Sequence, residues 1–182
     1  EVIDMELQLK DLETIEKRIT AIHRKAQSGD KEAGKTHSIF QLLKDHIEAG
    51  NSARSADMDA EQWAMVPDLH LLTAKPVLYL CNVDENSVKT GNTHVECLQK
   101  AVADEQAEVL VLGAGIEADI SELETFDERQ MFLDDLGLTE PGVSKLIRSA
   151  YSLLNLQTYF TAGVKEVRAW TIRKGSTAPQ AA

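Results

Sequence analysis

Two short stretches of the chain carry residue types that could recognise a nucleotide base. Asn82-Val83-Asp84-Glu85 comes directly after one apolar run, and Gly113-Ala114-Gly115 comes directly after another. An Asn side chain both donates and accepts hydrogen bonds, and a carboxylate accepts from an exocyclic amine. A backbone N–H at Ala114 could meet an acceptor on the same ring. Together the two stretches could form a purine-base pocket, although such an Asn is more commonly a simple strand-end turn residue.

A second motif matches a phosphate-binding loop by its letters alone. Residues 29–36, Gly-Asp-Lys-Glu-Ala-Gly-Lys-Thr, satisfy G-x-x-x-x-G-K-T. A working loop of this kind follows a buried strand and wraps phosphate in backbone N–H groups. Here the preceding residues continue a charged helical pattern, and Asp30 and Glu32 would repel phosphate. We therefore predict a connection between two helices, and no nucleotide binding by Lys35.

The elements around this connection form a helical hairpin. A heptad-like seam with charged residues between its members predicts one helix over residues 1–28, and a second periodic run of apolar residues lies between Ile39 and Ile47. The seam consists of Met5, Leu9, Leu12, Ile19, Ile22 and Ala26, widened by Leu7 and Ile15. Two such helices with a short connection favour an antiparallel coiled-coil hairpin.

The two base-contacting stretches require a different architecture. Residues 76–82 and 108–112 are apolar and β-favouring, which predicts two buried strands, with Cys81 inside the first. A helical pattern over residues 92–106 lies between them, so the order predicts a βαβ unit with a parallel sheet. Loops at the carboxyl ends of parallel strands are where α/β sheets bind ligands. The fold class is therefore α/β.

Shorter elements complete the expected outline. Asp57 or Asp59 could cap a short helix through residues 61–63. Helical patterns continue from residue 116 to residue 137. Pro141 is placed to start a helix that runs to about residue 154. Residues 158–172 predict a β-hairpin that turns at Ala162-Gly163.

Composition limits the function further. The chain has 182 residues and a formal charge of −11, but residues 104–140 alone carry twelve acids and one base, and residues 143–182 carry six bases and one acid. General nucleic-acid binding is disfavoured, because phosphate contacts need Lys and Arg. A local RNA or ribosome contact fits the basic end.

No apolar run approaches the ~20 residues of a membrane span. The first residues resemble no signal peptide, and a first residue other than Met suggests a fragment. Cys81 and Cys97 form no disulfide or zinc pattern, and the five histidines lack ligand spacing. We expect a cytoplasmic protein with no metal site in this segment.

The residues also resemble a known family along essentially the whole chain. Asn82-x-x-Glu85, followed by x-Ala114-x-Ile116-Glu117, resembles the fourth and fifth nucleotide motifs of the YchF/Obg-like ATPases in the P-loop GTPase superfamily. The same resemblance is carried by residues 11–14, 135–138, 140–142, 155–170 and 178–182. It implies a coiled-coil hairpin insertion (1–56), the C-terminal part of a P-loop nucleotidase domain (57–154) and the start of a β-grasp TGS domain (155–182).

The resemblance also implies an activity. Ordinary GTPases carry Asp in an N-K-x-D motif where this chain has Glu85, and the family accepts ATP over GTP. Asn82, the Val83 backbone and Glu85 would contact the base, with Gly113 and Ala114 as the second loop. Gly113 stands where the family often has Ser, and Gly115 where it has Ala or Lys, so the details of the second loop depart from the pattern.

The resemblance places the P-loop, the switch regions and the Mg²⁺ ligands before residue 1, and most of the TGS domain after residue 182. This chain would then hold no catalytic or metal residue and would be inactive alone. The parent is expected to be a monomeric, ribosome-associated nucleotidase that uses Mg²⁺ and hydrolyses ATP, with GTP as a second substrate. It would contact ribosome or RNA through TGS and coiled-coil surfaces, with no membrane. The alternative is a non-enzymatic interaction module built on the hairpin.

Overall fold

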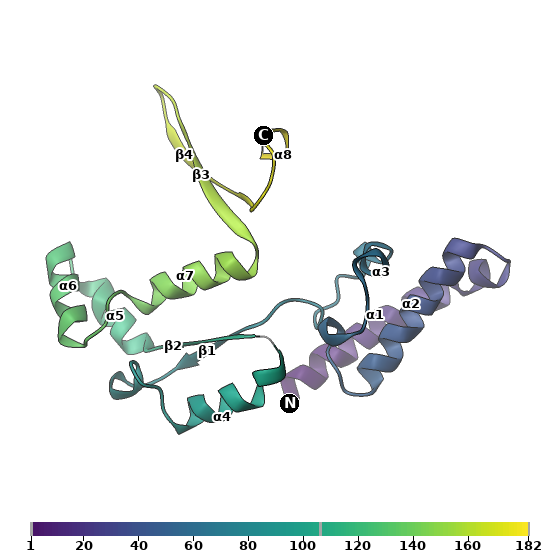
Figure 1. Ribbon diagram of the computed structural model, residues 1–182, viewed down its shortest axis with the longest axis horizontal. Coiled ribbons are helices and arrows are strands. Elements are labelled where there is room, and N and C mark those ends of the chain that lie inside the picture. Colours follow the sequence, from purple (N-terminus) through teal and green to yellow (C-terminus); the bar gives the residue numbers. More distant parts are fainter. Residues whose placement is uncertain (1, 106, 182) are drawn as a thin grey trace. The chain divides into compact units, whose positions relative to one another are not determined.

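The chain folds as two compact units, residues 1–76 and 77–182 (Figure 1). The structure is a computed structural model that describes residues 2–105 and 107–181. No helix in these described ranges is long and apolar enough to cross a membrane.

The first unit is built on a pair of long helices, α1 (Val2–Gln27) and α2 (Lys31–Glu48), as the periodicity predicts. A connection of three residues forces the helices to run antiparallel. Across the pair, Lys44 Nζ lies 2.8 Å from Glu16 Oε1. The predicted helical hairpin is therefore confirmed.

The phosphate-loop look-alike is the turn of this hairpin. Gly29 adopts φ +91°, which favours glycine, and Asp30 is the N-cap of α2. The Asp30 carboxylate accepts hydrogen bonds from the backbone N–H groups of Glu32 and Ala33 at 3.0 and 3.1 Å. Lys35 and Thr36 lie inside α2. The predicted helix–helix connection is therefore confirmed. The backbone N–H groups of Glu32 and Ala33, which a phosphate would need, already bond to the Asp30 carboxylate.

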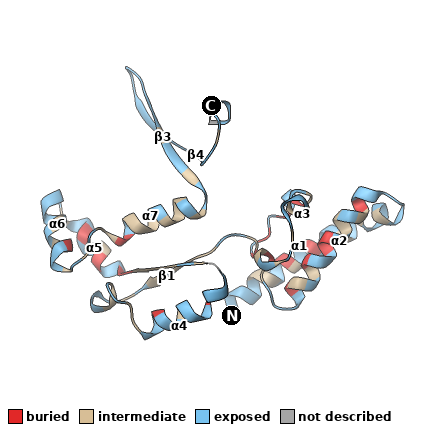
Figure 2. Cartoon of the chain, viewed as in Figure 1, coloured by how far each residue is buried: buried red, intermediate tan, exposed pale blue. Residues whose placement is uncertain are grey.

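The buried stripe of α1 differs from the predicted seam. Ile15 has 0% exposure and is the most buried apolar residue of the helix, whereas Met5 and Leu9 are 54% and 66% exposed. Most of α1 is coloured as exposed or intermediate (Figure 2). Leu12, Ile19 and Ile22 do pack on the core. The predicted seam was wrong at Met5 and Leu9, because these two positions face away from the residues that pack against α1.

A buried carboxylate fastens the rest of this unit to α1. Asp11 is 1% exposed and accepts hydrogen bonds from Leu72 N, Thr73 N and Thr73 Oγ1 at 2.7, 2.8 and 2.7 Å. Thr73 Oγ1 in turn accepts from Ala53 N at 2.9 Å. One charged side chain thus satisfies three donors, and it holds the loop at residues 72–73 against α1.

The segment between α2 and residue 76 contains only short elements. They are 3-10 turns at Ala53–Ser55 and Pro67–Leu69, and α3 (Ala60–Ala64). Asp59 caps α3 in a capping box with Gln62, which confirms one of the two predicted caps. Val66, Leu69 and Leu71 join the core of the hairpin, so this segment packs with the helices that precede it.

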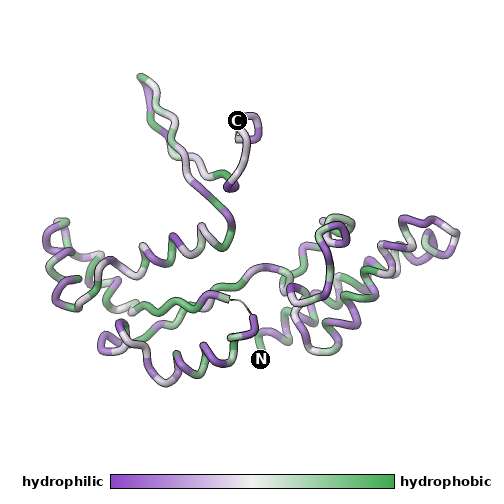
Figure 3. Tube along the Cα trace, in the orientation of Figure 1, coloured by the Kyte–Doolittle hydropathy of each residue, from purple (hydrophilic) through white to green (hydrophobic). Residues whose placement is uncertain are grey.

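The second unit begins with the predicted βαβ arrangement. β1 (Leu78–Asn82) and β2 (Glu108–Leu112) pair in parallel, with Asn82 opposite Leu112. The intervening α4 (Thr93–Ala101) starts at an Asn92 cap and is followed by a 3-10 turn at Ala103–Glu105. Hydrophobic residues run along both strands (Figure 3).

The strands are less buried than predicted. Only Leu112 of the ten strand residues is buried, Leu80 is 46% exposed and Cys81 is half-buried. The physical reason is that, within the described residues, β1 and β2 pair only with each other. Each strand therefore keeps one open edge.

Helices and a hairpin complete this unit. α5 (Ala114–Glu122) and α6 (Phe126–Asp135) are followed by α7 (Gly142–Leu153), with Pro141 at its N-cap. α7 packs against both β1 and β2. β3 (Leu156–Ala162) and β4 (Val167–Arg173) form the predicted antiparallel hairpin, and the short α8 (Ala178–Ala181) follows. The turn between the strands covers residues 163–166.

Candidate nucleotide-base site

The parallel pairing brings the two predicted loops together. Asn82 ends β1, and the ladder continues one step further because Val83 N–H donates to Leu112 O at 2.9 Å. Gly113 follows Leu112 directly and is the N-cap of α5. Both loops therefore lie at the carboxyl end of the sheet, as the sequence predicts.

A direct hydrogen bond joins the loops. Ala114 N–H donates to Asn82 Oδ1 at 2.9 Å. Because the partner is a donor, the acceptor must be the carbonyl oxygen of the Asn82 amide, and the NH₂ group of this exposed side chain remains free to donate outward. The predicted ligand contact of the Ala114 N–H stays a prediction, and a ligand would have to take over this bond.

The two carboxylates of the first loop have different roles. Asp84 Oδ1 accepts from Ser87 N and Ser87 Oγ at 3.1 and 3.0 Å, which caps the 3-10 turn Glu85–Ser87. Glu85 is exposed, and none of the hydrogen bonds or ion pairs of the described residues engages it. Of the two, Glu85 is the carboxylate that is available to a ligand.

The loops surround a hollow of about 410 Å³. Its lining includes four of the predicted residues, Asn82, Val83, Glu85 and Gly113, and leaves out Ala114. Asp84 and Asp119 also line it. Three carboxylates at one hollow favour a ligand rich in N–H donors and disfavour phosphate, which suits the base end of a nucleotide. In the described ranges no cluster of three His, Cys, Asp or Glu residues could hold a metal ion.

Gly113 allows the close approach of the two loops. A Cβ at this position would lie 3.3 Å from Val83 O and 3.2 Å from Ile116 Cδ1, so a side chain would require its neighbours to shift by a few tenths of an ångström. At Gly115 a Cβ would meet nothing within 4 Å. The departure from the family pattern at Gly115 therefore changes no packing.

Glu117, whose structural role was not predicted from the sequence, holds the second loop in place. The Glu117 carboxylate accepts from Gly142 N at 2.6 Å and from Val143 N at 3.2 Å. It thus caps the first turn of α7, whose own N-cap, Pro141, makes no side-chain hydrogen bond. A Cβ at Gly142 would lie 2.8 Å from Leu112 Cβ, so only glycine fits there. The sequence does carry one signal for this contact. The predicted helix starts at Pro141 and has no Ser, Thr, Asp or Asn to cap it, so its first N–H groups need an acceptor from elsewhere.

Comparison with known proteins shows which proteins this chain is similar to. Residues 156–182 match the family model YchF-GTPase_C, described as "Protein of unknown function (DUF933)". The chain is 48% identical over 184 residues to the "Ribosome-binding ATPase YchF" of Bacillus subtilis (strain 168). It is 45% identical over 182 residues to the protein of the same name in Escherichia coli O157:H7.

Each match covers 100% of this chain and 50% of the relative, so the chain spans about half the length of the curated relatives it matches. The structure of the Schizosaccharomyces pombe YchF GTPase superposes with a TM-score of 0.87 at 28% identity, over 99% of this chain and 50% of that one. The fold is thus a portion of a P-loop α/β protein that carries a helical hairpin. Over its whole length the chain is therefore similar to about half of a YchF protein.

Proposed function

We propose that this chain is the base-recognition part of a ribosome-binding nucleotidase that hydrolyses ATP, with GTP as a possible second substrate. The observation that carries the proposal is the 2.9 Å hydrogen bond from Ala114 N to Asn82 Oδ1, which joins the two loops at the sheet edge. The names of the relatives, "Ribosome-binding ATPase YchF" and "YchF GTPase", support the same class of activity.

The proposed base contacts follow from the available atoms. The free NH₂ of Asn82 donates to a ring nitrogen, and the Glu85 carboxylate accepts from an exocyclic amine. The Val83 backbone and the Gly113-Ala114 loop flank the ring. Phosphoryl transfer needs Mg²⁺ and phosphate-binding groups. We place those groups in other parts of the parent protein, so the 182-residue chain alone should be inactive.

The proposed domain division has hairpin insertion at 1–56, nucleotidase at 57–154 and TGS domain from 155. The family model that begins at residue 156 supports the last boundary. In the structure, residues 57–76 pack with the hairpin, so the proposed nucleotidase portion shares a core with the insertion.

We further propose a cytoplasmic, monomeric parent that contacts ribosomal RNA through its basic end and ribosomal surfaces through the hairpin. Support comes from the surface of β4, where the Arg168 guanidinium lies 5.6 Å from the centroid of the exposed Trp170 ring. Arg148 of α7 and Lys174 line a hollow of about 540 Å³ next to the start of β3. Basic and aromatic groups together suit RNA.

The decisive experiment compares ATP and GTP affinity in the full-length protein before and after Glu85→Asp. Shortening the carboxylate should change the ATP-to-GTP affinity ratio by roughly tenfold or more, because a site that hydrogen-bonds its ligand discriminates strongly. Glu96→Asp makes the same change on α4, outside the hollow, and should leave the ratio unaltered. An unchanged ratio for Glu85→Asp would remove the role assigned to Glu85.

The second candidate is a non-enzymatic interaction module built on the hairpin. The observation that favours it is the core of the first unit, whose members all come from α1, α2 and the segment up to residue 76. ATP turnover by the full-length protein, with none by a variant that lacks phosphate-binding groups, would exclude this reading.

A further inference from the structure

Two adjoining hollows run along the surface of the first unit. They lie between residues 35–46 of α2 and residues 57–65, measure about 320 and 690 Å³, and share Ser38 and Leu42 as lining residues. We refer to them together as the α2–α3 groove. None of the residues of the candidate base site contributes to it.

The apolar lining of the groove lies mainly in the smaller hollow, and we call its three residues, Ile39, Leu42 and Met65, the floor. Ile39 is 6% exposed and belongs to the core, so the floor rests on rigid packing. Leu42 is 37% exposed and Met65 is half-buried, and both line the groove. An apolar side chain of a partner would remove these surfaces from water.

The rim of the groove is acidic. The groove is lined by one lysine, Lys35, by two histidines, His37 and His46, and by four exposed carboxylates. The carboxylates belong to Asp45, Asp57, Asp59 and Glu61. Asp59 caps α3, and Asp45 accepts from Gln41 Nε2 at 2.7 Å. The carboxylates of Asp57 and Glu61 take part in no hydrogen bond or ion pair within the described ranges.

We propose that the α2–α3 groove binds a basic peptide segment of a protein partner. An apolar side chain of that segment rests on Leu42 and Met65, while its Lys or Arg residues meet Asp57 and Glu61. Charge complementarity selects this occupant, because the rim attracts cations and repels the phosphates of nucleic acid. The groove thus gives the hairpin a partner class different from the RNA proposed for the basic end.

The direct test measures binding of short fluorescein-labelled peptides to the full chain by fluorescence anisotropy. A peptide of alternating Arg and Leu should bind saturably, and more weakly as salt is raised. A labelled peptide of alternating Glu and Leu, measured separately in the same way, should not bind. Absence of saturable binding by the Arg–Leu peptide, or equal binding by the Glu–Leu peptide, would overturn the proposal.

Matched variants locate the binding. Asp57→Asn combined with Glu61→Gln should weaken the Arg–Leu peptide roughly tenfold. Glu6→Gln combined with Asp68→Asn makes the same charge change at exposed sites outside the groove and should cost less than about twofold. Leu42→Ser should weaken binding with the charges intact.

Equal losses in the two double variants would mean that only the overall charge of −11 attracts the peptide, and the groove would then be rejected. A circular dichroism melt of each variant checks that folding is retained. Nucleotide affinity is a separate readout, so either proposal can fail without the other.

Discussion

The two compact units cover their apolar residues to different extents. In the first unit, nine buried hydrophobic residues form one cluster around α1 and α2, whereas the clearest cluster of the second is Ile116, Ile120 and Leu133. β1 and β2 carry residues typical of strands covered on both faces, yet Leu80 is 46% exposed. The first unit therefore buries its apolar residues against its own elements. In the second unit, the apolar side chains of the strands are only partly covered by the other described residues.

The largest expected effect on stability comes from a comparison of two leucines, one in each unit. Leu43 is 0% exposed and Leu80 is 46% exposed. Leu43→Ala should cost about 3 kcal/mol of unfolding free energy, because it leaves a cavity in a closed core. Leu80→Ala should cost less than about 1 kcal/mol. The chain has two tryptophans, Trp63 and Trp170, so urea unfolding can be followed in each unit after replacing the other Trp by Phe. Equal costs would contradict the contrast.

The next test removes the polar anchor of the first unit. Asp11→Asn keeps one carbonyl oxygen for three donors and adds an NH₂ group among them, so it should destabilise the unit by about 2 kcal/mol. Glu6→Gln, at an exposed position of the same helix, should stay within about 0.5 kcal/mol. Urea unfolding measures both. A loss no larger than that of Glu6→Gln would show that Asp11 is not the anchor.

A smaller effect is expected at the cap of α7. Glu117→Ala removes the acceptor for Gly142 N and Val143 N, and should cost about 1 kcal/mol. Glu122→Ala, one turn along α5 and exposed, is the control. If the urea midpoints of the two variants coincide, the cap contributes nothing to the second unit.

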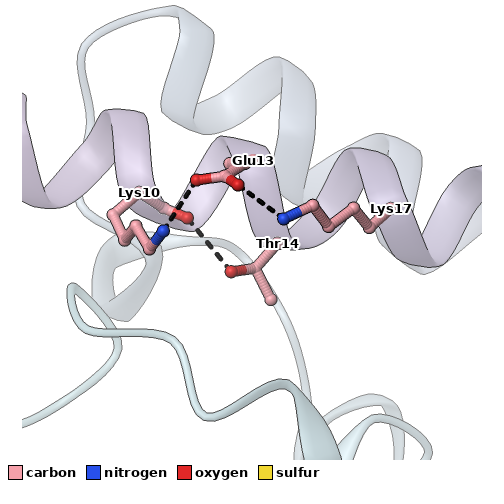
Figure 4. A network of polar contacts seen from close by, with 4 residues as sticks. All are labelled: Lys10, Glu13, Thr14 and Lys17. Atoms are coloured by element: carbon pink, nitrogen blue, oxygen red, sulfur yellow. Dashed lines mark hydrogen bonds and ion pairs between the residues drawn. The ribbon is translucent and has the colours of Figure 1, made fainter.

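The smallest effect concerns the surface of α1. Hydrogen bonds from Lys10 and Lys17 lower the pKa of the Glu13 carboxyl from 4.5 to about 2 (Figure 4). Since the folded pKa is depressed, the support that this network gives α1 is present above pH 4.5 and is lost as the pH falls through about 2.

Carboxyl-carbon NMR of Glu13 measures this pKa directly. Lys10→Ala with Lys17→Ala should raise it toward 4.5. Thr14→Ala should not change it, because the Thr14 hydroxyl donates to Lys10 O and leaves the carboxylate alone. A Glu13 pKa of 4.5 in the unaltered protein would show that the network does not persist in solution.

The same contrast explains what could be predicted from the sequence. Local patterns sufficed for the helical hairpin, the parallel strands and the loop that ends in Glu85, because spacing and strand-end position are local properties. No local pattern marks Asp11 as buried. Its burial depends on Leu72 and Thr73, some sixty positions away. The cap from Glu117 to Gly142 spans 25 positions and likewise has no local signal. Long-range polar contacts were therefore the part that only the structure supplied.

The Glu117 cap has a consequence for observing the candidate site. The amide hydrogens of Gly142 and Val143 bond to a side chain that starts three residues after the hydrogen-bonded Ala114. Their hydrogen–deuterium exchange therefore reports how firmly the second loop is held. If a nucleotide orders that loop, these two amides should slow their exchange although they lie outside the lining of the hollow. Exchange at these two amides would therefore report nucleotide binding without any label on the nucleotide.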